Sequence, residues 1–150
     1  MYKLYFKQIP TSQVYYIRLT NTSAMIKKLP HSATQSLVIG CILAWLRQQA
    51  GLDQRQMAHF LGITQASWSR IENGHATANI EQILNSCAAM RIDFVYVAQL
   101  YTYICRQLEK IDIAVTSDAD DQSPEVRKIV KQTISAHALS VSNKALNTDA

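Results

Sequence analysis

A chain of 150 residues, 48% hydrophobic and 17% charged, has room for one ordinary domain with extensions and enough apolar side chains for a packed core. This composition argues against wholesale disorder, and no stretch approaches the roughly 18 consecutive apolar residues of a membrane-spanning helix. The net charge is +4, and the charges are unevenly distributed along the chain. Residues 1–36 contain no acidic residue and five basic ones, Lys3, Lys7, Arg18, Lys27 and Lys28. Such a bias is compatible with a polyanionic partner.

The N-terminus and the cysteines indicate the compartment. The first residues lack the unbroken apolar run and the cleavage site of a secretory signal. Cys41, Cys87 and Cys105 are odd in number and far apart, and each lies in an apolar helical pattern. This usage argues against a disulfide framework and for core thiols in a reducing compartment. We expect a soluble cytoplasmic protein.

Residues 1–35 are predicted to form a basic N-terminal extension. Two runs rich in Tyr, Phe, Ile and Val, residues 2–9 and 13–20, flank a Pro-Thr-Ser sequence, and the first alternates with a period of two. This pattern predicts a β-hairpin, followed by a polar connector over residues 21–35. The hairpin could contact DNA phosphates or complete a dimer interface, and the sequence leaves both roles open.

Four short helices are predicted next. They run from Leu37 to about Gln49 after Ser36, from Gln54 to Leu61 after Asp53, from Gln65 to Asn73 after Thr64, and from about Asn79 to Met90. The side chains before the first three suit N-caps, and a glycine follows each of those helices. Helices of this length joined by short turns predict a compact all-α unit.

Residues 92–111 predict a fifth helix, from Asp93 to about Lys110. Its apolar residues recur at spacings of three and four, at Phe94, Val97, Tyr101, Ile104, Leu108 and Ile111. The apolar stripe is too wide for a free coiled coil, so packing on the domain or on a partner fits better. A strand over Ile92–Val97 that pairs across a dimer is the alternative.

Residues 112–150 are predicted to be an acidic linker and a short helix. The linker covers Thr116–Ser123, and Ser123-Pro124-Glu125 is typical of a helix start. An amphipathic helix over residues 126–137 would pack on the domain or bind a partner protein. The last ten residues are expected to be disordered.

The stretch from Gln54 to Ile71 has the spacing of a helix-turn-helix. Ala58 lies where two helices would cross most closely, and Gly62 lies in the turn, where a left-handed backbone favours glycine. The positions that point inward are all apolar, namely Met57, Leu61, Ile63, Trp68 and Ile71. This pattern predicts a DNA-binding motif rather than a helical hairpin that merely packs.

These residues resemble the Cro/cI-like (Xre-type) helix-turn-helix regulators of bacteria, phages and plasmids. The resemblance covers residues 37–91 and rests on Ile39-Gly40, Leu43, Leu46-Arg47, Gly51-Leu52-Asp53-Gln54, Met57-Ala58, Leu61-Gly62-Ile63-Thr64, Ser69-Arg70-Ile71-Glu72-Asn73-Gly74 and Ile80-Glu81-Gln82-Ile83-Leu84. It implies a mainly α, lambda-repressor-like five-helix domain over residues 36–111 that docks its third helix in the major groove of double-stranded DNA. The chain departs from the family's pattern at two positions. Trp68 stands where the family usually has an aliphatic residue, and Ala78 stands where a proline is common.

Helical rotation turns Ala66, Ser69, Arg70 and Asn73 outward when Trp68 points inward. Gln65 can pair with adenine and Arg70 with guanine, and Ala66 and the Thr64 methyl suit a thymine methyl. Ser67 and Ser69 could reach backbone or base. Gln54 and the backbone N–H groups at the start of its helix can hold a phosphate, and the resemblance implies a second phosphate contact at Asn73.

The resemblance also implies a structural pair, in which Arg47 at the end of the first helix binds Glu72 at the end of the third. We expect this pair to position the recognition helix with Ala58, Gly62 and Trp68. His31, His59, His75 and His137 show no ligand spacing, and no catalytic grouping or phosphate loop appears. We therefore expect no metal, no cofactor and no enzymatic activity.

The sequence predicts a homodimeric repressor that reads an inverted-repeat operator and dimerises through residues 92–111. Its basic extension covers residues 1–35. Its acidic linker and C-terminal helix together cover residues 112–150. The alternative is an antitoxin that autoregulates through the same motif while the C-terminal segment binds a toxin.

Overall fold

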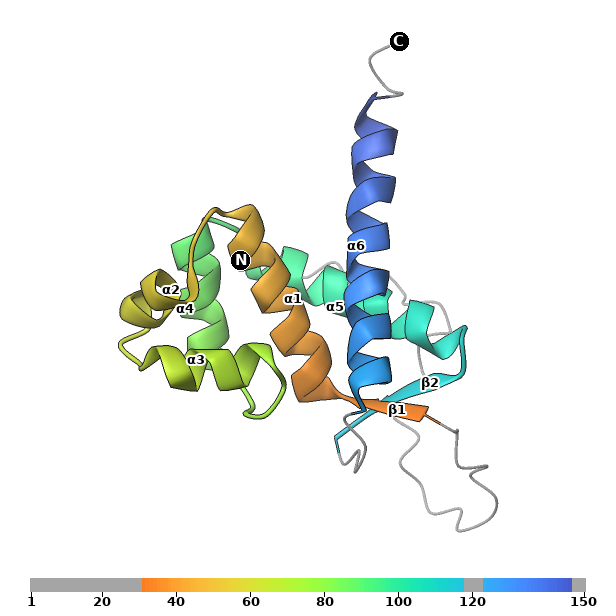
Figure 1. The fold of residues 1–150 in the computed structure, drawn as a ribbon. Coiled ribbons are helices and arrows are strands. Elements are labelled where there is room, and N and C mark those ends of the chain that lie inside the picture. The colour runs from red at the N-terminus through yellow and green to blue at the C-terminus, as the bar shows by residue number, and fades with distance from the viewer. Residues whose placement is uncertain (1–30, 118–122, 147–150) are drawn as a thin grey trace, which may run out of the picture.

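The computed structural model describes residues 31–117 and 123–146, so the hairpin predicted within residues 1–30 lies outside the described residues. Within those ranges the chain forms six helices and one pair of short strands, which confirms the mainly α fold (Figure 1). The elements, in chain order, are β1 (His31–Thr34), α1 (Gln35–Gln49), α2 (Gln54–Phe60), α3 (Gln65–Glu72), α4 (Ile80–Met90), α5 (Phe94–Glu109), β2 (Ile113–Thr116) and α6 (Pro124–Leu146).

The first four predicted helices are confirmed, and local capping explains where they begin. Asp53 accepts a hydrogen bond from the backbone N–H of Gln56 at 2.7 Å, and the Gln56 side chain accepts one from the Asp53 N–H at 2.8 Å. The expected cap Ser36 is wrong. Thr34 Oγ1 accepts from the Leu37 N–H at 3.0 Å, so α1 begins two residues earlier than predicted.

β1 and β2 form a parallel pair, with His31 opposite Ile113 and Thr34 opposite Thr116. This pairing corrects the expectation of a connector through residue 35. It also places a strand, β2, inside the segment 112–150, where only a linker and a helix were predicted. A four-residue strand forms only where a partner completes its hydrogen bonds, and neither run reveals that partner. Helices α1–α5 lie between the two strands in the chain, so the pair joins the two ends of the five-helix unit.

The fifth helix is confirmed as α5, and the alternative strand over Ile92–Val97 is wrong. Asp93 Oδ1 accepts from the Val95 N–H at 3.1 Å and begins the helix. The middle of the predicted apolar stripe is used inside the chain itself, because Val97, Ile104 and Leu108 are buried. The ends of the stripe, Phe94 and Ile111, remain exposed.

α6 is longer than the predicted helix over residues 126–137 and reaches Leu146. Residues 141–146 are therefore helical rather than disordered, and residues 147–150 lie outside the described residues. Val126, Val130 and Ile134 are each at most 1% exposed and form the stripe with which α6 packs against α1 and α5 (Figure 1). Of the two predicted roles of this face, packing on its own domain is the one observed.

Gly40 allows α1 to approach the end of α3. A Cβ added at Gly40 would lie 2.1 Å from the Ile71 carbonyl oxygen and 3.1 Å from the Glu72 carbonyl carbon. Real Cβ atoms do not approach backbone this closely, so only glycine fits without separating the two helices. The position of α3 relative to α1 depends on this contact.

We predict that Gly40→Ala lowers the free energy of unfolding by about 1–3 kcal/mol, because overpacking outweighs the better helix propensity of alanine. Urea denaturation followed by circular dichroism measures the change. Gln48→Ala, at an exposed position of the same helix, serves as the control and should change stability by less than about 0.5 kcal/mol. Equal stability of Gly40→Ala and the wild type would contradict the close packing.

Candidate nucleic-acid interface

The helix-turn-helix consists of α2, α3 and the turn that contains Gly62. Gly62 has a φ of 64°, a conformation that side-chain-bearing residues rarely adopt. Ala58 is 2% exposed on the inner face of α2. Among the positions predicted to point inward, Met57, Trp68 and Ile71 are buried, and Leu61 and Ile63 are half-buried against the core. The motif is thus held from its inner side.

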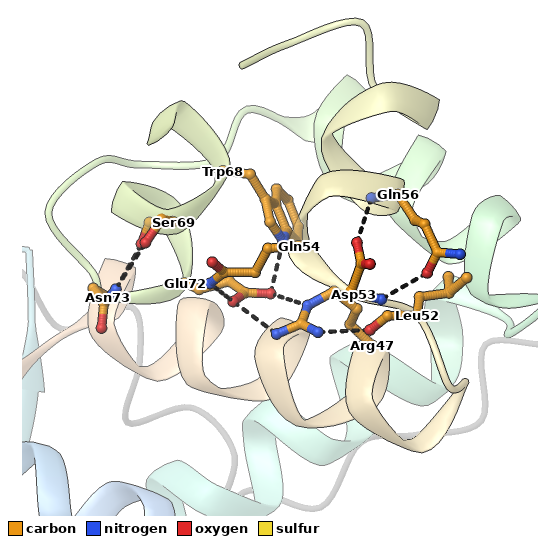
Figure 2. A network of polar contacts seen from close by, with 9 residues as sticks. All are labelled: Arg47, Leu52, Asp53, Gln54, Gln56, Trp68, Ser69, Glu72 and Asn73. Carbon is orange, nitrogen blue, oxygen red and sulfur yellow. Dashed lines mark hydrogen bonds and ion pairs between the residues drawn. The ribbon is translucent and has the colours of Figure 1, made fainter. Parts of the chain in front are cut away.

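The carboxylate of Glu72 lies at the centre of a buried polar network (Figure 2). Arg47 donates from Nε to Oε1 at 2.5 Å and from Nη2 to Oε2 at 3.0 Å, a two-pronged ion pair between the ends of α1 and α3. The remaining Arg47 nitrogen, Nη1, donates to the Leu52 carbonyl oxygen at 2.6 Å. Because both side chains are less than 10% exposed, water competes little with this pair.

Trp68 contributes a hydrogen bond as well as bulk. Its indole Nε1 donates to Glu72 Oε1 at 2.7 Å, one helical turn along α3. The ring is fully buried, so its N–H requires a partner, and Glu72 supplies it. An aliphatic residue at this position would not make this bond. The i, i+4 spacing of Trp68 and Glu72 was the available sequence signal for it.

Gln54 is directed toward Glu72. Its side-chain Nε2 donates to Glu72 Oε2 at 2.6 Å, which ties the start of α2 to the end of α3. The sequence predicted that this side chain contacts a DNA phosphate instead. One of its two amide hydrogens is engaged by Glu72, so the same side chain has at most its second amide hydrogen to offer to a phosphate.

The outer face of α3 carries most of the residues predicted to contact DNA. Gln65, Ala66, Ser67 and Arg70 are exposed, Ser69 is half-buried, and Thr64 is exposed at the helix start. Thr64 Oγ1 caps α3 by accepting from the Ser67 N–H at 3.1 Å and lies 2.8 Å from Ser67 Oγ. Gln65, Ala66 and Arg70 are therefore the side chains best placed to face a groove.

Asn73 is bound to two other elements of the structure. Its Nδ2 donates to the Ser69 carbonyl oxygen at 2.8 Å, at the end of α3. Its Oδ1 accepts from Arg127 Nη1 of α6 at 3.1 Å. The sequence reasoning missed Arg127, because these two residues are 54 positions apart and no local pattern joins them.

The cysteines are free and lie in the core. Burial raises the pKa of Cys41, Cys87 and Cys105 above the ordinary value for a thiol, which keeps all three protonated at neutral pH. In the described part of the chain no His, Cys, Asp and Glu side chains form a group that could hold a metal ion. No helix in that part is long and apolar enough to cross a membrane.

We predict that Glu72→Gln lowers the free energy of unfolding by about 3–5 kcal/mol. The amide turns an NH₂ group toward donors and leaves the Arg47 guanidinium buried without its counter-charge. Urea denaturation measures the loss. Glu81→Gln, in the exposed first turn of α4, is the matched control and should cost less than about 1 kcal/mol. Equal losses in the two variants would contradict a central role for Glu72.

Comparison with known proteins agrees with this geometry. Residues 38–93 match a family described as "Helix-turn-helix domain". No curated protein matches the chain. A crystal structure of the clp gene regulator ClgR from C. glutamicum is similar, with 19% sequence identity and a TM-score of 0.43, over 45% of this chain and 87% of that chain. The family match over residues 38–93 supports a helix-turn-helix domain in this part of the chain, and with it DNA binding and a role in transcription regulation.

Proposed function

We propose that the chain is a sequence-specific transcriptional regulator that represses as a homodimer. The observation that carries the proposal is the two-sided character of α3. Trp68, Ile71 and Glu72 anchor one side in the core, and Gln65, Ala66 and Arg70 are free on the other. A rigid helix with short polar side chains and one arginine on its outer face suits the major groove.

Each outer residue has a defined partner chemistry. Gln65 can donate to and accept from the edge of adenine, and Arg70 can donate twice to guanine. Ala66 and the methyl group of Thr64 suit a thymine methyl. Ser67 and Ser69 can reach the DNA backbone or a base, and Gln54 and Asn73 lie at the two ends of the motif, where phosphates pass.

A second copy is proposed because one recognition helix reads only a few base pairs. Two helices about 34 Å apart on one side of the duplex would read an inverted repeat. The outer side of α5 supports this role, since Phe94, Val95 and Tyr96 are large apolar or aromatic residues that remain 37–57% exposed. The interface would therefore use this side and not the middle of the predicted stripe, which is in the core.

Repression would follow from occupation of an operator that overlaps a promoter in a bacterial, phage or plasmid genome, which places the protein in the cytoplasm. The antitoxin alternative assigned partner binding to the C-terminal segment. The stripe of Val126, Val130 and Ile134 in its helix is buried against α1 and α5, so these three side chains are occupied within the domain.

We predict that Arg70→Ala loses base preference at one position in each half-site, with a cost of about 1–3 kcal/mol against the preferred base. Selection from random duplex DNA by wild type and variant measures this preference. Arg91→Asn removes the same charge from the loop between α4 and α5 and should leave the selected sequence unchanged. Enrichment of no sequence by the wild type would contradict sequence-specific regulation.

We predict that Val95→Glu converts the dimer to a monomer, because two carboxylates would be buried face to face. Light scattering after size exclusion measures the mass. Val95 is 57% exposed, so the monomer should keep its fold. Leu84→Glu, at an exposed apolar position of α4, is the control and should remain dimeric. Dissociation by Leu84→Glu alone would assign the interface to α4 instead.

A further inference from the structure

Arg127 links the appended helix α6 to the recognition helix. α6 begins at Pro124, outside residues 38–93, which match the helix-turn-helix family. In Figure 1, α3 and the first turns of α1 and α6 lie along the same lower edge of the molecule. There Arg127 Nη1 donates to Asn73 Oδ1 at 3.1 Å, and Arg127 Nη2 lies 3.4 Å from His75 Nε2.

Within the described part of the chain, the guanidinium of Arg127 has no acidic partner. The Asn73 amide is neutral, and His75 can accept from Arg127 only as the neutral imidazole. The ion pair found among residues 31–117 and 123–146, between Arg47 and Glu72, does not involve Arg127. Arg127 Nε is buried and has no hydrogen-bond partner in that part of the chain. Lys128 and Lys131, both exposed, add further positive charge to α6.

We infer that Arg127 is a DNA phosphate contact that α6 adds to the helix-turn-helix. This inference rests on the proposed function. Asn73 and His75 fix the guanidinium beside the end of the recognition helix, at the edge where a helix lying in the major groove meets the DNA backbone. Arginine suits this role because its planar donors match two phosphate oxygens, and Asn73 and His75 use only two of its five N–H groups.

A purely structural role for Arg127 is the competing explanation. A cation near the C-terminal end of α3 would stabilise the helix through its dipole and would hold Asn73 in place. Salt dependence separates the two roles. A phosphate contact releases a counter-ion and changes the slope of log K against log salt, whereas a positioning residue changes the affinity and leaves the slope unchanged.

The experiment measures the affinity of the full-length wild type and its variants for two DNA duplexes, the selected operator and a random sequence. The salt concentration is varied from roughly 50 to 200 mM. Arg127→Gln should weaken binding to both duplexes by a similar factor of about ten and reduce the salt slope by about 0.9. Lys110→Gln, which removes one charge at the distant end of α5, is the control and should retain the wild-type slope.

Arg127→Lys tests whether the loss of DNA affinity in Arg127→Gln reflects a folding defect alone. It keeps the charge and loses the fork that holds Asn73 and His75, so the slope should stay near that of the wild type while the affinity falls by less than in Arg127→Gln. An unchanged slope in Arg127→Gln, with sequence preference intact, would overturn the phosphate contact and leave the proposed function standing. Binding by the wild type without any sequence preference would instead overturn the proposal of a sequence-specific regulator. The salt slope of Arg127→Gln on the random duplex would then still test the phosphate contact. A wild type that binds neither duplex would overturn both.

Discussion

The orientation of the recognition helix depends on one buried carboxylate. Glu72 accepts hydrogen bonds from Arg47 of α1, Gln54 of α2 and Trp68 of α3, so three helices converge on a single group. Taking a carboxylate out of water is costly unless its acceptor sites are filled, and these donors fill them. Because a partly satisfied network would be worse than none, the three helices are expected to assume their relative positions together.

The same arrangement separates stability from DNA recognition. The network and the contact at Gly40 hold α3 from its inner side, and the outer residues Gln65, Ala66 and Arg70 contribute little to packing. Substitutions on the outer face can therefore change which bases are preferred with little effect on the fold. The two-sided helix is the physical link between the core and the proposed function.

The described segments β1, β2 and α6, which lie outside the helix-turn-helix, belong to the same folded unit. The strands β1 and β2 pair across the whole five-helix unit, and α6 packs its stripe of Val126, Val130 and Ile134 onto α1 and α5. A helix that could have been a separate appendage is thereby fixed next to α3. This packing brings Arg127 to Asn73 and gives α6 its proposed place at the DNA backbone.

The sequence by itself determined the helices and the motif, because caps and apolar periodicity act within a few residues. Asp53, Thr64 and Asp93 each cap a helix where they were expected to, and the spacing of Ala58, Gly62 and Trp68 predicted the helix-turn-helix. The Arg47–Glu72 pair was available only through a family resemblance. Tertiary structure alone decided the β1–β2 pairing, the direction of Gln54 and the contact of Arg127 with Asn73. In each of these the partners are far apart in the chain, so packing of the whole unit selects them and no local pattern encodes them.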